Sequence, residues 1–365
     1  MSLALGNTLR EGASFLRAYV GGGYPAFIYP PGRLGDELPV FFYHGVDGRT
    51  FERHLQYLQA NGYRTVACDE AVELAAERRS GGRAVMLTFD DGLASVYLSA
   101  FPLARRHGVR IVLYIVPSRI GRPGFLTWEQ CRAMHRSGLV DIQSHSYAHK
   151  RVVTALAVQG ILNGPPADAW GVPGLDPIGL PERPAHLPVF EAASLFEASR
   201  AYRLPAAFWE DWLALQRREG ASRARALRGR LLELLEAHAR GVQVVDGEAL
   251  RREIREDLES SRACIEDQLP GHRVRHFAYP WHRHGPAAWM ALEAAGFRSA
   301  AIGLGIPEGR KPAGLAESVL ELRRVNADFL LCLPGRGRTP FRRVLAGKAM
   351  RRFRSTNRGG QGGHV

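Results

Sequence analysis

Two adjacent carboxylates, Asp90 and Asp91, end a short apolar run at residues 85–89, and Gly92 follows them directly. The run has the length and bulk of a buried parallel strand, and catalytic groups collect at strand ends in α/β folds. Neighbouring residues of an extended chain point in opposite directions, so the two acids can take different tasks around one centre. The alternative is a strand-to-helix turn in which an aspartate only caps the helix.

Two histidines, His145 and His149, follow a second apolar stretch at residues 139–143. They face the same way if the chain turns helically after the strand, and neutral imidazole is the commonest protein ligand for zinc. One carboxylate and two histidines leave coordination positions open, as a catalytic zinc ion requires. We therefore predict a metal site built from the aspartate pair and these histidines; the alternative is two solvated histidines on a helix.

Residues 88–92 (TFDDG) and 145–149 (HSYAH) match the first two motifs of the polysaccharide deacetylases, also called the NodB homology domain or carbohydrate esterase family 4. Residues 277–280 (FAYP) match the third motif as the biofilm poly-N-acetylglucosamine deacetylase branch has it, and residues 38–72 resemble that branch's opening. The resemblance implies a distorted (β/α)7-8 barrel. It also implies an enzyme that removes acetyl groups from N-acetylated amino sugars or polysaccharide.

The resemblance implies a role for each motif residue. Asp91, His145 and His149 would hold Zn²⁺ or another divalent transition metal, and Asp90 would be the general base. His44, at the end of the first expected strand, would be the general acid that protonates the departing amine. The alternative for His44 is a strand-end histidine bonded to a backbone carbonyl.

The third motif departs from the family pattern in two ways. Trp281 stands where the family usually has tyrosine, and its backbone N–H is the implied donor to the reaction's oxyanion. Ala278 stands where many members carry an arginine that orients the catalytic aspartate. Arg323 or Arg324, in a late strand, can take its place, and we include Arg324 among the predicted catalytic residues.

After this motif, residues 281–285 (WHRHG) replace the usual Tyr-Gly and add two histidines, His282 and His284. They either bind an anionic group, compete for the acid role, or are two surface histidines in a loop. We favour the surface interpretation, because loops between barrel elements run over the surface of a protein.

Strand and helix patterns alternate along most of the chain, which indicates parallel βα units and an α/β barrel. We divide the chain into an N-terminal arm (1–37), a first barrel part (38–152), an insertion (153–246), a second barrel part (247–328) and a basic amphipathic tail (329–365).

The insertion at 153–246 is predicted to be Pro-rich at first and then largely helical, with helical patterns at 189–201, 206–218 and 222–239. Because it follows a predicted ligand, we expect a lid or substrate wall; a surface embellishment or dimer contact is the alternative. Its tryptophans either stack on sugar rings or pack a core, and the core is favoured; they are Trp170, Trp209 and Trp212.

The composition is that of a globular protein, with 45% hydrophobic and 23% charged residues. The net charge of +13 is concentrated at the end of the chain, because no acidic residue follows Asp328. Residues 340–354 have the pattern of a basic interfacial helix, which suggests peripheral membrane contact. The alternative is a charged helix docked on the body. Nucleic acid is not an expected partner, because aromatic interleaving and a recognised binding fold are missing.

Four widely spaced cysteines indicate ordinary thiols. No apolar stretch is long enough to span a membrane, and no secretory signal is evident, which predicts a cytoplasmic position, with membrane association through the tail as a hypothesis. Two alternatives to N-deacetylation remain open: an O-acetyl carbohydrate esterase and a non-catalytic carbohydrate-binding relative. The sugar substrate and the oligomeric state are not predicted.

Overall fold

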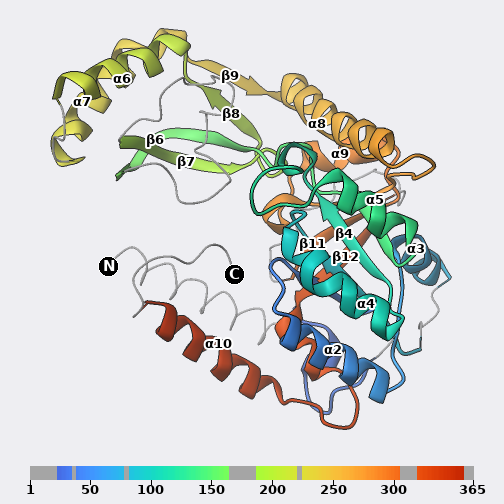
Figure 1. Ribbon diagram of the computed structural model, residues 1–365. Coiled ribbons are helices and arrows are strands. Elements are labelled where there is room, and N and C mark those ends of the chain that lie inside the picture. The colour runs from blue at the N-terminus through green and yellow to red at the C-terminus, as the bar shows by residue number, and fades with distance from the viewer. Residues whose placement is uncertain are drawn as a thin grey trace.

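The computed structural model describes residues 23–34, 38–77, 82–163, 186–219, 224–304 and 319–356. Its centre is a parallel sheet with the strand order β1-β12-β11-β10-β5-β4-β3-β2, and a further pairing of β1 with β3 closes seven of these strands into a barrel (Figure 1). The strands are β1 (Val40–Tyr43), β2 (Arg64–Thr65), β3 (Ala84–Phe89), β4 (Ile111–Ile115), β5 (Val140–Ser144), β10 (His276–Ala278), β11 (Ser299–Gly303) and β12 (Leu320–Asn326). The predicted distorted barrel is confirmed.

Helices between the strands cover the outside of the barrel. They are α2 (Gly48–Ala60), α3 (Cys68–Ala76), α4 (Phe101–His107), α5 (Trp128–Arg136), α8 (Gly247–Gln268) and α9 (Pro286–Ala294). Short helical turns are η1 (Ala26–Ile28), η2 (Val96–Ala100), η3 (Pro117–Arg119), η4 (Ala239–Gly241), η5 (Pro280–His282) and η6 (Ala327–Cys332). Helix α5 begins with a capping box, in which the side chains of Thr127 and Gln130 each accept the other's backbone N–H.

Because side chains point alternately to the two faces of each strand, the apolar residues form two separate cores. Met86 on β3 belongs to the apolar cluster that fills the barrel, whereas Val85 and Leu87 belong to the larger cluster between the sheet and its helices. All six residues of β3 are buried, as a strand covered on both faces requires. The same alternation turns the residue after each strand end either into the barrel mouth or away from it.

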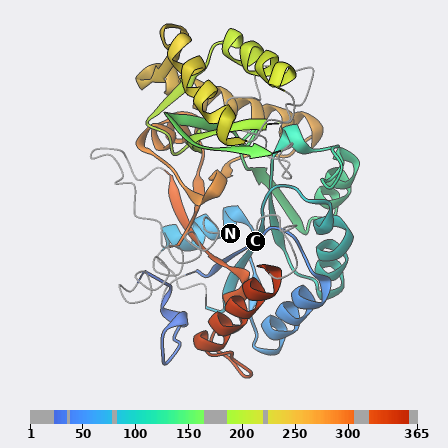
Figure 2. The ribbon, with the colours of Figure 1, turned by 90° about the vertical axis from the view of Figure 1, so that its left-hand side faces the viewer.

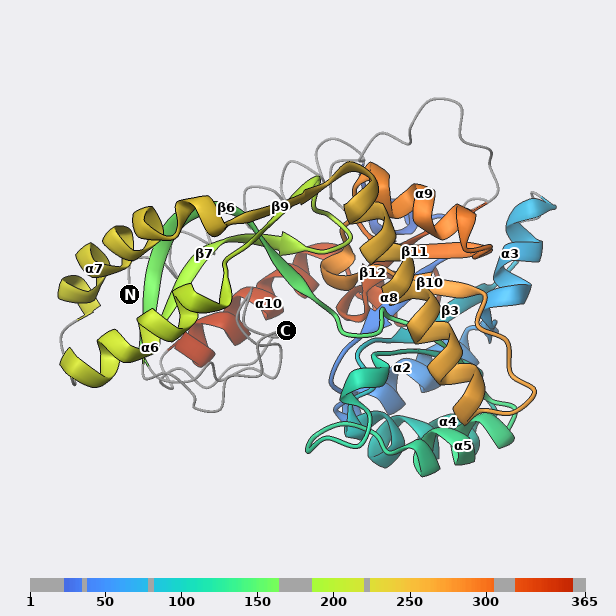
Figure 3. The ribbon, with the colours of Figure 1, turned by 90° about the horizontal axis from the view of Figure 1, so that it is seen from above.

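The insertion forms a separate antiparallel sheet with the order β7-β6-β8-β9. Its elements are β6 (Arg151–Asn163), β7 (His186–Ser194), β8 (Arg200–Arg203), β9 (Gln243–Asp246), α6 (Ala206–Glu219) and α7 (Ala224–Ala237). The sheet and its two helices extend from the barrel to one side, most clearly in Figure 3. Trp209 and Trp212 are buried in their common core, as favoured from the sequence, and Trp170 lies outside the described residues.

The predicted helix at 189–201 is wrong, because most of that segment is β7 and the start of β8. The insertion is therefore a mixed sheet-and-helix unit, not a largely helical one. Strand β6, with 13 residues, offers β7 a long antiparallel partner, and this tertiary pairing outweighs the local preference of an alanine-containing segment.

Both ends of the described chain pack against the barrel. Phe27 and Ile28 of the N-terminal arm are buried in the main core, and residues 1–22 of that arm lie outside the described residues. Helix α10 (Phe341–Thr356) places the ring of Phe341 5.5 Å from that of Phe329 in η6. Figure 2 shows α10 and the insertion at opposite ends of the molecule.

Among the described residues there is no helix with the length and apolar character needed to cross a membrane. All four cysteines are free, as expected from their spacing.

Candidate active site

The carboxyl ends of the barrel strands bring the predicted site residues to one mouth of the barrel. Asp90 and Asp91 follow β3, His145 follows β5, and His44 follows β1. Because parallel strands end at the same edge of a sheet, residues far apart in the sequence meet here. Arg324 reaches the same mouth from within β12.

Asp91, His145 and His149 form a buried cluster whose ligand atoms face one another. An Asp91 carboxylate oxygen, Oδ1, lies 3.5 Å from His145 Nε2 and 3.8 Å from His149 Nε2. Two ligands at about 2.0–2.1 Å from a tetrahedral zinc ion lie about 3.4 Å apart, so these separations suit a shared ion better than direct hydrogen bonds. This cluster could therefore hold a metal ion.

The protonation of the cluster also suits a cation. His145 Nδ1 donates to the Ala278 carbonyl at 2.8 Å, which leaves the Nε2 lone pair for the side that faces Asp91. Burial lowers the pKa of His145 to about 4 and that of His149 well below its usual value. Burial, together with the neighbouring Asp90, raises the pKa of Asp91 to about 8. A divalent ion would favour the ionised form of Asp91 and bind the two neutral imidazoles.

The chain between the two histidines is a loop, so the helical turn expected there is wrong. Ser146 and His149 have left-handed backbone angles, with φ of 71° and 51°, and Ser146 Oγ accepts the His149 N–H at 2.7 Å. Asp257 on α8 accepts the N–H groups of Tyr147 at 2.8 Å and Ala148 at 3.3 Å. This carboxylate, which the sequence did not single out, fixes the loop that carries the second histidine.

Asp90 faces the barrel interior, where Arg324 binds it through both oxygens. Arg324 Nη1 lies 2.6 Å from Asp90 Oδ1, and Nη2 lies 2.9 Å from Oδ2. Burial alone would raise the pKa of Asp90, but the charge and hydrogen bonds of Arg324 hold it below its usual range. Asp91, with a φ of 72°, turns out of the strand pattern, and so the two acids have separate partners.

His44 lies close to Asp90, and Trp281 lies against His149. The half-buried ring of His44 lies 5.6 Å from that of Phe42 and lines a cavity of about 610 Å³ that continues towards α10. Trp281 has a left-handed backbone, with φ of 52°, and its ring lies 4.1 Å from that of His149. The ring of Trp281 thus packs against one of the candidate metal ligands.

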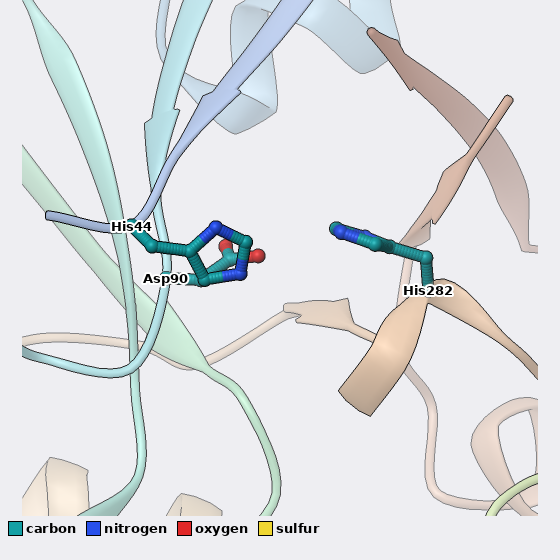
Figure 4. Close-up of side chains that lie close together, drawn as sticks. All are labelled: His44, Asp90 and His282. Atoms are coloured by element: carbon teal, nitrogen blue, oxygen red, sulfur yellow. The ribbon is translucent and has the colours of Figure 1, made fainter. Parts of the chain in front are cut away.

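His282 and His284 are partly buried and packed against other residues, so the interpretation as two surface histidines, favoured from the sequence, is wrong. His282 Nδ1 lies 3.0 Å from Arg324 Nη2, and Figure 4 shows its ring pointing towards His44 and Asp90. His284 has a side chain only 9% exposed, and its ring lies 4.8 Å from that of Tyr279. The position of His282, two residues after the third motif, was the one signal that could have placed it in the site.

Residues 77–161 match the family model described as polysaccharide deacetylase. This segment of the chain is similar to the polysaccharide deacetylases. The chain is 30% identical over 122 residues to a Bacillus subtilis (strain 168) protein whose name assigns it to the polysaccharide deacetylases, covering 31% of this chain and 43% of that protein. It is 24% identical over 109 residues to a poly-beta-1,6-N-acetyl-D-glucosamine N-deacetylase of Staphylococcus epidermidis, covering 28% of this chain and 38% of that one.

The chain thus matches less than half the length of these two curated relatives. Among solved structures, a de-N-acetylase from Aggregatibacter actinomycetemcomitans superposes with a TM-score of 0.50 at 17% identity, covering 79% of this chain and 95% of that one. The BpsB deacetylase domain from Bordetella bronchiseptica gives the same TM-score and identity, with 79% and 96% covered. At this identity the likeness shows the fold alone, and that fold is the barrel described above.

Proposed function

We propose that this protein is a metal-dependent hydrolase of the polysaccharide deacetylase family that removes acetyl groups from N-acetylated amino sugars or polysaccharide. The observation that carries the proposal is that the two adjacent acids, Asp90 and Asp91, have different partners. Asp91 faces two imidazoles at 3.5 and 3.8 Å, while Asp90 is bound through both oxygens to Arg324. Metal-assisted amide hydrolysis uses ligands that hold the ion and a separate group that accepts a proton, and this arrangement offers one acid for each task.

Asp91, His145 and His149 would hold the ion, and Zn²⁺ suits two imidazoles and one carboxylate with open positions. A divalent ion bound there activates a water molecule and polarises the amide carbonyl. The residues of the chain supply orientation and proton transfer.

Asp90 is the proposed base that accepts the proton of the attacking water. Arg324 keeps it ionised and fixes its plane, and each carboxylate oxygen keeps a second lone pair for the water. The same guanidinium lowers the proton affinity of Asp90, so Arg324 improves orientation at the expense of basicity. His44 is the proposed acid for the leaving amine, and the Trp281 N–H the proposed oxyanion donor.

The experiment is a product assay on a panel of N-acetylglucosamine oligomers and O-acetylated oligosaccharides. N-deacetylation predicts that free amine appears one-for-one with acetate and that chelation of the metal stops both. Acetate released only from O-acetylated substrates would establish the esterase alternative. If neither class of substrate releases acetate from metal-loaded protein, the non-catalytic alternative replaces the proposal.

Peripheral membrane contact through residues 340–354 stays a prediction, as does the cytoplasmic position. Three apolar side chains of this helix, Phe341, Val344 and Leu345, pack against the main core, and Lys348 pairs with Asp328 at 3.2 Å. These contacts support the docked alternative, because membrane insertion would expose part of the barrel core. Co-sedimentation with anionic liposomes, with and without Arg342→Ser and Arg343→Ser, tests the membrane hypothesis; equal binding by both proteins would contradict it.

A further inference from the structure

The loop that follows β10 is held in an unusual conformation beside the proposed base. Trp281 and His282 both have left-handed backbone angles, with φ of 52° and 62°. Two successive non-glycine residues in this region cost free energy, which the surroundings must offset. The His282 N–H donates to the Tyr279 carbonyl at 2.9 Å, which closes the turn.

The insertion supplies the other contacts that hold this loop. Arg283 pairs with Glu197 at 2.9 Å, and the Gly285 N–H donates to the Phe196 carbonyl at 2.7 Å. A Cβ at Gly285 would lie 2.8 Å from the Glu197 carbonyl oxygen, so the two backbones meet too closely for any other residue. The turn between β7 and β8 therefore fixes where the side chain of His282 lies.

The contact with Arg324 sets the tautomer of His282. A guanidinium has only hydrogen-bond donors, so His282 Nδ1, 3.0 Å from Arg324 Nη2, must accept. The ring proton is then on Nε2, and the imidazole is neutral. Burial, followed by the charge of Arg324, lowers the pKa of His282 well below its usual value, in the same direction.

This geometry excludes two other roles for His282. One ligand atom from each of His44, Asp90 and His282 lies within 4.8 Å of the others, which resembles a second metal site. However, Arg324 already binds His282 Nδ1 and both Asp90 oxygens, and a metal ion there would face its positive charge. A neutral imidazole also has no readily released proton, which leaves the acid role to His44.

We propose that His282 is a substrate-binding residue whose Nε2–H donates a hydrogen bond to a hydroxyl oxygen of the sugar that carries the acetyl amide. Figure 4 shows the ring of His282 directed at both His44 and Asp90 from the opposite side, so it lies next to the proposed acid and the proposed base. Arg324 thereby orients two groups at once, the carboxylate of Asp90 and the imidazole of His282. The inference rests on the proposed deacetylase function.

Two substitutions separate substrate contact from support of Arg324. In His282→Asn the side-chain oxygen can take the place of Nδ1 and keep the bond to Arg324, but nothing replaces the Nε2 donor. In His282→Gln the amide nitrogen can reach the place of Nε2 and keep the donor. Thermal unfolding and metal content of both variants are measured first, so that only folded, loaded proteins are compared.

The inference predicts that His282→Asn raises KM for N-acetylglucosamine oligomers about five- to tenfold with little change in kcat, as expected for one lost hydrogen bond that serves binding. His282→Gln should keep KM within about twofold of wild type. A larger increase in KM for His282→Gln than for His282→Asn would show that His282 acts only through Arg324 and would overturn the inference. Equal effects of the two substitutions, or none, would also overturn it.

Binding measured without turnover separates this inference from the proposed function. In the Asp90→Asn background, calorimetry with an N-acetylglucosamine oligomer should give a Kd that His282→Asn raises about five- to tenfold and His282→Gln leaves nearly unchanged. If His282→Asn weakens binding and His282→Gln does not, while wild-type protein releases no acetate, the proposed function fails and the binding role stands. If wild-type protein deacetylates but the two substitutions do not differ in Kd in this way, the binding role fails. It also fails if no saturable binding occurs.

Discussion

Arg324, within the last barrel strand, binds both carboxylate oxygens of Asp90 at 2.6 and 2.9 Å, and neither side chain is exposed to solvent. The preceding residue, Arg323, points out of the barrel, and its side chain is 51% exposed. This alternation on β12 places one of two adjacent arginines in the site and the other on the surface. The pair therefore offers a matched comparison of a buried and an exposed arginine.

We expect Arg324→Met to lower the free energy of unfolding by about 3–5 kcal/mol, because it leaves a buried carboxylate without its partner. Arg323→Met, the control, should change it by less than about 0.5 kcal/mol. Urea unfolding measures both. Equal changes in the two variants would contradict the buried ion pair.

Arg324→Lys tests the same contact through the pH dependence of activity. Lysine keeps the charge but cannot bind both oxygens of Asp90. It therefore counteracts less well the rise in the pKa of Asp90 that burial causes. The pKa of Asp90 is lowered in the folded protein, so its ionised form persists as pH falls until that low pKa is reached. In Arg324→Lys this pKa should rise, and the acid limb of the kcat/KM profile should move to higher pH. An unmoved acid limb would argue against Asp90 as the titrating base.

Asp257 should control metal affinity without touching the metal. It accepts two backbone N–H groups between His145 and His149, so Asp257→Ala frees the loop that carries the second histidine. We expect Zn²⁺ affinity, measured by competition with a chromophoric chelator, to fall about 10–100-fold. Glu256→Ala, at the exposed neighbouring position on α8, is the control and should leave affinity unchanged. Unchanged affinity in Asp257→Ala would show that the loop holds its shape without this carboxylate.

His54 gives a pH-dependent contribution to stability away from the candidate metal ligands. Its ring is buried, 2.9 Å from the Tyr43 hydroxyl, and burial together with Arg53 lowers its pKa from 6.5 to about 4. The unfolded chain binds a proton below pH 6.5 and the folded chain does not, so stability is full above pH 6.5 and falls as pH drops towards 4. We expect a loss on the order of 3 kcal/mol from this group.

His54→Asn should remove that contribution, because the asparagine oxygen can take the Nδ1 position but does not titrate. Unfolding in urea at pH 7, 6 and 5 should show the wild-type and variant free energies converging as pH falls, since all other histidines are common to both proteins. Parallel curves would mean that folding does not lower the pKa of His54.

The fold and the meeting of the motif residues could be predicted because they depend on patterns that repeat. Apolar runs of strand length ended at Asp90 and at His145, and parallel strands end at one face of a barrel, so these residues had to approach each other. Arg324 could be proposed because the late strand that carries it forms part of the same barrel.

What could not be predicted depends on contacts between distant segments. Left-handed backbone at Ser146 and His282 has no sequence signal, since neither residue is glycine. His282 enters the site because the Gly285 segment is bonded to Phe196 of the insertion, and the strand that leads to Phe196 was mistaken for helix. Asp257 belongs to a charged helix, where an acid ordinarily faces solvent.

The most direct test of the account compares Asp90→Asn with Asp91→Asn by metal content and acetate release in the same preparations. The account predicts that Asp90→Asn keeps about one metal ion per chain while kcat falls by about 10²–10⁴, because it loses only the base. Asp91→Asn should lose the metal and the activity together, because it loses a ligand. Near-normal acetate release by Asp90→Asn, or full metal content in Asp91→Asn, would contradict the assignment of base and ligand to these two acids.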